Sequence, residues 1–205
     1  MTTTGKTTTS ASKSIHYVVK IAILSALAAI IMLFEFPLPF APGFYKLDLS
    51  EVVILMGGFA MGPIASIIIE LIKNIINIIL NGTTTAFIGE FANFITGCAL
   101  VVPASIIYKY NKSLKGALIS LITGTLSLAL VGSLINYFVL IPAFSKFYHM
   151  ELDKIVSAGS SVNPLVTDLK TLVVFAVAPF NLVKGILCSL LNLLLYKRVS
   201  KLLHI

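Results

Sequence analysis

The stretch FPLPFAPGFYKLDLSEVVILMGGFAMGP, residues 36–63, decides the fold of this chain. Three prolines fall within residues 37–42, aromatic and charged side chains follow, and an apolar run interrupted by glycines ends at Pro63. The Pro-rich, mixed-charge part cannot cross a lipid core, because its backbone polar groups would find no partners there. It predicts an ordered loop at one membrane face that forms the lid or wall of a binding site and leads into two short helices.

The amino-acid composition indicates an integral membrane protein. Of its 205 residues, 58% are hydrophobic and 11% are charged, and the mean hydropathy is +1.01. These values are typical of integral membrane proteins. We expect one membrane domain over residues 15–205, preceded by a polar, disordered tail over residues 1–14. The net charge of +7 comes from basic residues at the ends of apolar runs, which indicates topology signals and lipid contacts rather than nucleic-acid binding.

The apolar runs predict an all-α protein with six transmembrane helices. Four runs are long enough to cross a bilayer, at residues 17–34, 86–108, 117–144 and 172–196. Residues 49–80 would form a helix of roughly 48 Å, so we expect two helices hinged within residues 57–63. This division places three basic groups on one face, with both termini in the cytoplasm, as the positive-inside rule requires. The groups are Lys6/Lys13/Lys20, Lys109/Lys112/Lys115 and Lys197/Arg198/Lys201.

Polar residues inside the apolar runs are candidates for function or for helix pairing. Glu70 and Lys73 are three residues apart, which predicts an ion pair on one helix face. Lys184 has no acidic neighbour within a turn of its own helix, so it requires a partner from elsewhere or a polar ligand. Asn181 precedes it by three residues, and Asn136 lies at similar depth on the helix before. This set suits a flat apolar ligand with an amide-like edge, and helix-to-helix hydrogen bonds are the alternative.

Other patterns narrow the functional class. Three histidines lie in separate regions without metal-ligand spacing, so we expect no metal site. A nucleophile and base at catalytic spacing are missing from the sequence, so we expect no enzyme and no cofactor. Ala22 and Ala26 place two small side chains on one helix face, which allows close approach of another helix or arises by chance.

Several motifs together resemble the riboflavin-specific S-components of energy-coupling factor (ECF) transporters. They are FPLPF with LDLSEV in the first loop, GEFANF, and PFNLVKG. The resemblance extends over nearly all six predicted spans. It implies a multi-pass protein of a prokaryotic cell membrane that binds riboflavin from outside as its transported substrate. It also implies association with a transmembrane coupling subunit and two cytoplasmic ATPases, which power release inward.

The resemblance also implies roles for individual residues. Leu47 and Asp48 match the wall formed by the first loop. Asn136, Asn181 and Lys184 match the residues that contact the flavin and its ribityl chain. Ala22 and Ala26 match the helix face toward the coupling subunit.

Two alternatives remain at this point. A stand-alone secondary transporter or facilitator would need an ion-coupling site, for which Glu70 and Lys73 are the candidates. An S-component for another vitamin, such as pantothenate or thiamine, would keep the architecture and change the pocket. A requirement for ATP and partner subunits in uptake would distinguish an ECF S-component from the first alternative.

Overall fold

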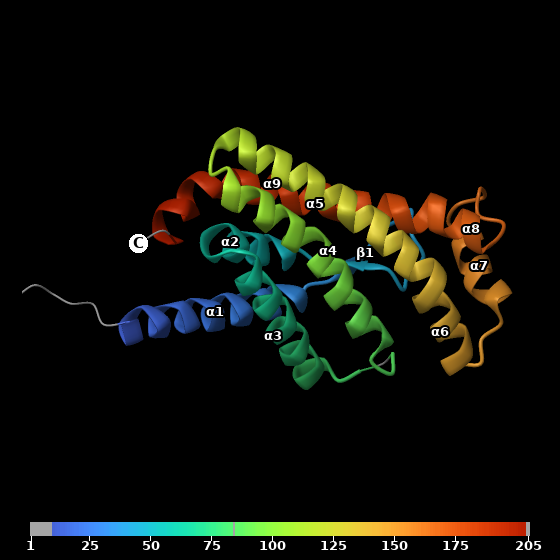
Figure 1. Cartoon of the computed structure of the whole chain (residues 1–205). Coiled ribbons are helices and arrows are strands. Elements are labelled where there is room, and N and C mark those ends of the chain that lie inside the picture. The colour runs from blue at the N-terminus through green and yellow to red at the C-terminus, as the bar shows by residue number, and fades with distance from the viewer. Residues whose placement is uncertain (1–9, 84, 204–205) are drawn as a thin grey trace, which may run out of the picture.

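The computed structural model describes residues 10–83 and 85–203, with side chains described for residues 14–83 and 85–195, and it is mostly helical (Figure 1). The elements in chain order are α1 (Ser10–Met32), β1 (Phe36–Pro37), β2 (Lys46–Leu47), α2 (Glu51–Met61), α3 (Pro63–Asn81), α4 (Ile88–Tyr110), α5 (Leu114–Ile135), α6 (Ile141–Phe147), α7 (Leu152–Ser160), α8 (Leu169–Leu172) and α9 (Ala178–Leu203). Of the tail expected over residues 1–14, residues 1–9 lie outside the described residues, and α1 begins at Ser10.

Among the residues that the structure describes, five helical segments are long and apolar enough to cross a membrane. They are Ser14–Met32, Pro63–Asn81, Ile88–Tyr110, Leu114–Phe147 and Leu169–Leu195. The helical membrane class predicted from composition is therefore confirmed. α2 is apolar but has only 11 residues, so the count of six spans stays a prediction.

The long apolar run divides into two helices, as the sequence predicted, but the break is narrower than expected. It falls at Gly62 and Pro63, where Gly62 has φ +95°, a conformation that suits glycine. Pro63 then takes the first position of α3, where its missing N–H costs nothing. Gly57 and Gly58, which we expected to belong to the hinge, lie inside α2.

These two glycines let α2 pack at the centre of the bundle. α2 contacts α1, α3, α4 and α9, and most of its residues are buried. A Cβ atom on Gly58 would lie 2.0 Å from the Ser105 hydroxyl of α4, and one on Gly57 would lie 2.5 Å from Ile69 of α3. A helix that is apolar on all sides requires such burial, so α2 forms the middle of the core.

Two long spans contain a π-helical turn next to a proline. Residues Asn136–Leu140 join α5 to α6, and residues Val173–Val177 join α8 to α9. Pro142 and Pro179 follow these turns closely. Proline lacks an N–H and its ring crowds the preceding turn, and a widened turn accommodates both effects without ending the helix.

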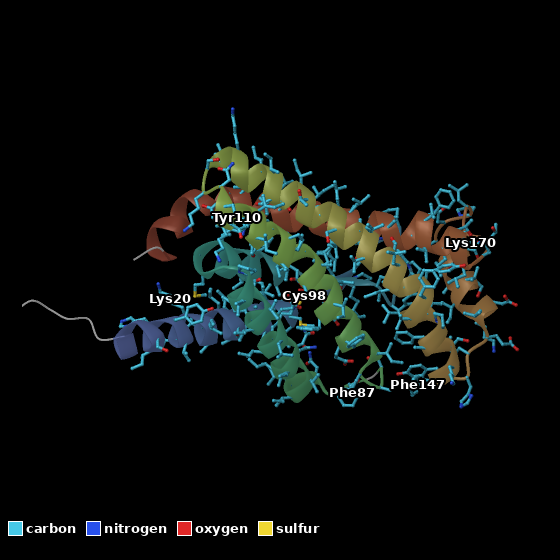
Figure 2. All side chains as sticks on the ribbon, in the orientation of Figure 1. Lys20, Phe87, Cys98, Tyr110, Phe147 and Lys170 are labelled. Carbon is cyan, nitrogen blue, oxygen red and sulfur yellow. The ribbon has the colours of Figure 1, made fainter. Side chains whose placement is uncertain are left out.

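The two ends of the molecule differ in their connections. The start of α1, the α4–α5 connection and the end of α9 lie at the left in Figure 1, while α6, α7 and α8 lie at the right. Lys20 and Tyr110 mark the first end in Figure 2, and Phe147 and Lys170 mark the other. The three basic groups of the sequence thus belong to segments at one end, although Lys6 and the side chains of Lys13 and of residues 196–203 lie outside the described part.

Candidate functional site

The first loop, residues 33–50, folds back on the bundle, and its strand β1 lies right of the centre in Figure 1. Its strands β1 and β2 pair antiparallel, with Phe36 opposite Leu47, a short hairpin that the sequence did not predict. Glu35 and Lys46 form an ion pair beside it. Leu47 is fully buried and packs in one apolar cluster with Ala41 and with Phe180 of α9. The first loop therefore packs against α9 through the buried side chain of Leu47.

Asp48 attaches the same loop to α9 through an ion pair. Its Oδ2 lies 3.0 Å from Lys184 Nζ, and both side chains are buried. Its Oδ1 accepts hydrogen bonds from the Ser50 backbone N–H, at 3.0 Å, and from the Ser50 hydroxyl. Burial acts to raise the pKa of Asp48, but the positive charges of Lys184 and Lys73 and the Ser50 hydrogen bond outweigh it and hold that pKa below its usual range. Of the two partners predicted for Lys184, a residue from elsewhere or a polar ligand, the structure shows the first.

The two asparagines of the predicted site lie together beside Gly132 of α5. The Asn136 amide Nδ2 donates to the Gly132 carbonyl at 2.7 Å. A Cβ atom on Gly132 would lie 2.5 Å from the Asn181 amide nitrogen, so glycine at this position lets α9 bring Asn181 close. Asn136 opens the π-helical turn, a feature that often marks functional sites.

Tyr45 of the first loop lies over this pair. Its hydroxyl donates to Asn136 Oδ1 at 2.6 Å, and its ring centroid lies 4.7 Å from that of Phe44 and 5.5 Å from that of Phe180. Aromatic faces and carboxamides therefore meet under one loop. The structure brings together the five residues predicted for ligand binding, Leu47, Asp48, Asn136, Asn181 and Lys184, at the contact of the first loop with α5 and α9.

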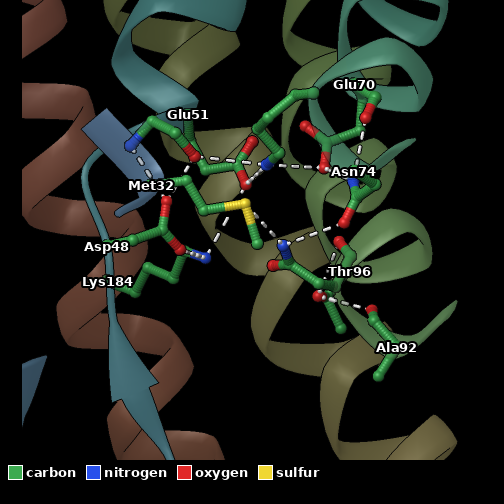
Figure 3. Close-up of polar contacts among 11 residues, drawn as sticks. Met32, Asp48, Glu51, Glu70, Asn74, Ala92, Thr96 and Lys184 are labelled. Atoms are coloured by element: carbon green, nitrogen blue, oxygen red, sulfur yellow. Dashed lines mark hydrogen bonds and ion pairs between the residues drawn. The ribbon is translucent and has the colours of Figure 1, made fainter. Parts of the chain in front are cut away.

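A second group of buried charges continues from this site into the core (Figure 3). Glu51 at the start of α2 lies 3.7 Å from Lys184, and its Oε1 lies 3.0 Å from Lys73 Nζ. Lys73 also contacts Glu70 at 2.7 Å, which confirms the ion pair predicted from their spacing. Asn74 donates to Glu70 and accepts from Asn93 of α4. This network ties α2, α3, α4 and α9 together.

Ala22 and Ala26 lie apart from the polar site, on the outward face of α1. Both are exposed, whereas the intervening Leu24 and Ser25 are buried against the bundle. Ile23 and Leu27 are exposed beside them. This face is apolar and contains small residues, which allow another helix to approach closely in lipid.

Three residues of this site were given no role from the sequence. Tyr45 lies in a loop whose aromatic positions carry no periodic signal. Glu51 follows Asp48 by three residues and begins an apolar helix, which was the available signal for a second buried carboxylate. Gly132 has no local signal, because its role depends on a side chain from another helix.

These features define a class: a helical membrane protein whose first loop closes over a polar site among the helix ends. Comparison with known proteins makes the class specific. The family described as ECF transporter, substrate-specific component, matches residues 16–196. The chain belongs to this family.

Individual relatives agree with the assignment. The chain is 34% identical over 185 residues to a protein of Staphylococcus aureus (strain TCH60) named riboflavin transporter RibU, covering 90% of each chain. It is 33% identical over 185 residues to the riboflavin transporter FmnP of Bacillus subtilis (strain 168), covering 89% of this chain and 90% of that one. A solved structure described as the S component of a bacterial ECF transporter superposes with a TM-score of 0.72 at 34% identity, covering 93% of this chain and 98% of the other.

Proposed function

We propose that this chain is the riboflavin-binding, substrate-specific subunit of an ECF-type importer. Relatives named riboflavin transporters match about nine tenths of its length, and the matched region includes the polar site. The main structural support for a binding site is that four polar side chains lie close together beneath one aromatic loop. They are Asp48, Asn136, Asn181 and Lys184.

The chemistry of the site suits a flavin. The ring system of riboflavin is flat and largely apolar, with N–H and C=O groups along one edge. Asn136 and Asn181 each offer a donor and an acceptor to such an edge, and Lys184 offers a cation to a carbonyl or hydroxyl oxygen. Burial of the rings against Tyr45 and Phe180 would supply affinity at roughly 25 cal/mol per Å² of apolar surface, and the polar groups would set orientation.

The proposed topology has six spans, with α2 as the short one, in the plasma membrane of a prokaryote. Both termini lie in the cytoplasm, because the basic segments gather at their end of the molecule. The site then opens to the outside. Ala22 and Ala26 form the surface for a transmembrane coupling subunit, and two ATPases complete the importer.

Riboflavin titration of the purified protein tests the substrate and the site. We expect saturable quenching of flavin fluorescence, weakened by Asn181→Ala and by Lys184→Ala. Loss of a buried hydrogen-bond partner costs about 1–3 kcal/mol, which corresponds to a roughly 5- to 150-fold higher Kd. Asn192→Ala is the matched control: Asn192 is a buried asparagine of the same helix, its amide donates to the Val52 carbonyl, and it lies roughly 16 Å further along.

Two outcomes decide against the proposal. Failure to quench riboflavin, with binding of another vitamin instead, assigns a different substrate to the same architecture. Uptake into vesicles by this subunit alone, without ATP, identifies a stand-alone transporter, with Glu70 and Lys73 as its ion-coupling candidates.

A further inference from the structure

The buried charges of the core do not balance. Three carboxylates, Asp48, Glu51 and Glu70, face two ammonium groups, Lys73 and Lys184. The side chains of Glu51, Glu70 and Lys73 are completely buried, and those of Asp48 and Lys184 nearly so. With every group ionised, the cluster holds one uncompensated negative charge.

An uncompensated charge in a membrane protein core is expensive. Its desolvation costs several kcal/mol even after relaxation, and a buried carboxyl group commonly neutralises by keeping a proton. Asp48 is not the group that does so, because it has Lys184 and the Ser50 hydroxyl as direct partners. The excess charge therefore belongs to Glu51 and Glu70, which share the ammonium of Lys73 at 3.0 and 2.7 Å.

The contacts of these two glutamates show where a proton fits. Oε2 of Glu51 and Oε2 of Glu70 are buried and receive no hydrogen bond from any residue that the structure describes. The other oxygen of each side chain, Oε1, lies 3.0 Å (Glu51) or 2.7 Å (Glu70) from Lys73 Nζ, so the two carboxyl groups, one from α2 and one from α3, meet at a single ammonium group (Figure 3). Ionised carboxylates contain acceptors alone. One proton would supply the missing donor and remove the excess charge.

Among the described residues, the cations that contact the pair are Lys73 and, on the Glu51 side, Lys184 of α9, which also pairs with Asp48. The other titratable groups that interact with the pair are the thiols of Cys98 of α4 and Cys188 of α9, and neither is a cation. Asn74 and Asn93 are neutral, and Met32 of α1 contacts Asn93 through its sulfur. The Asn74 amide thus donates a hydrogen bond to Glu70 Oε1, but these neutral neighbours do not compensate the negative charge of the two glutamates.

We propose that Glu51 and Glu70 together bind one proton at neutral pH, at a site separate from the riboflavin contacts. The proton comes from water while the carboxyl groups are accessible, and it remains with the pair once helices α2 and α3 pack. No covalent bond other than O–H is made. The proposal does not depend on the identity of the transported substrate, because it rests on charge and packing in the ligand-free protein.

Infrared spectroscopy of the ligand-free protein tests this site directly. A protonated carboxyl group has a carbonyl stretch that is separate from the carboxylate bands. We expect this band in the wild-type protein at neutral pH and its loss in both Glu70→Gln and Glu51→Gln, since either change restores charge balance without a proton. Glutamine has the shape of a protonated glutamate, so both variants should remain folded.

Glu90→Gln is the matched control, since Glu90 is a half-buried carboxylate of α4 that accepts a hydrogen bond from Thr85, outside the cluster. We expect the band to persist in this variant. A wild-type protein without the band at neutral pH overturns the proposal. So does a band that survives in Glu70→Gln or in Glu51→Gln, and if one variant does not fold, the other decides.

Discussion

The contact between Tyr45 and Asn136 gives the sharpest prediction about ligand binding. Both ends of the Asn136 amide are engaged in the structure, because its nitrogen donates to the Gly132 carbonyl and its Oδ1 accepts from the Tyr45 hydroxyl at 2.6 Å. Burial raises the pKa of Tyr45, so its phenol keeps the proton that it donates. A flavin donor that takes the position of this hydroxyl at Asn136 Oδ1 has to displace it, and Tyr45→Phe removes the competitor while keeping the ring.

The expected effect follows from the strength of one hydrogen bond. A typical intramolecular hydrogen bond contributes about 0.5–1.5 kcal/mol net. If riboflavin binding breaks the Tyr45–Asn136 bond, its removal should lower the Kd by about two- to thirteenfold. The aromatic contacts of the ring with Phe44 and Phe180 remain, so the apolar wall is unchanged.

The assay is flavin fluorescence quenching on purified protein, with Tyr137→Phe as control. Tyr137 is adjacent to Asn136, and its ring packs edge-on against Phe138 with centroids 4.9 Å apart. The same chemical change there should leave the Kd unaltered. An unchanged Kd for Tyr45→Phe would refute the reasoning, because the hydroxyl would then not compete with the ligand. A higher Kd would also refute it, because the hydroxyl would then bind the ligand.

Three further predictions concern packing, coupling and pH. Gly58→Ala should destabilise the protein by about 1–3 kcal/mol in thermal unfolding, because its Cβ would lie 2.0 Å from the Ser105 hydroxyl, while Gly43→Ala, with open space around it, should not. Ala26→Leu should leave riboflavin binding intact and abolish ATP-driven uptake in vesicles that contain the coupling subunit and ATPases. Asp168 accepts the Thr171 backbone N–H at the start of α8, which lowers the pKa of its carboxyl. Its ionised form thus stabilises the fold above the unfolded pKa near 4, and the melting temperatures of wild type and Asp168→Asn should converge as the pH falls through the folded value.

Each of these has a contrary result. Equal melting temperatures for the Gly58 and Gly43 variants would mean that α2 and α4 are not in close contact. Normal uptake by Ala26→Leu would remove the exposed face of α1 from the coupling surface. A constant difference in melting temperature between wild type and Asp168→Asn across acidic pH would exclude the carboxylate charge as the source of stabilisation.

Much of the architecture could be read from local sequence. Apolar runs of sufficient length specify membrane helices, since every backbone polar group in lipid needs a partner within the helix. Gly62 and Pro63 mark the division between α2 and α3, because one permits positive φ and the other suits a helix start. The spacing of Glu70 and Lys73 likewise predicts their ion pair, because the helical period alone brings them together.

The partners of the site residues were decided by tertiary structure alone. The sequence showed that Lys184 needs a counter-charge, but that Asp48 provides it depends on how the first loop packs against α9. The same holds for Tyr45 with Asn136 and for Glu51 with Lys73, which are joined across different elements. Periodicity records which face of a segment is buried. It contains no information on which distant segment covers that face, because this follows from the packing of the whole bundle.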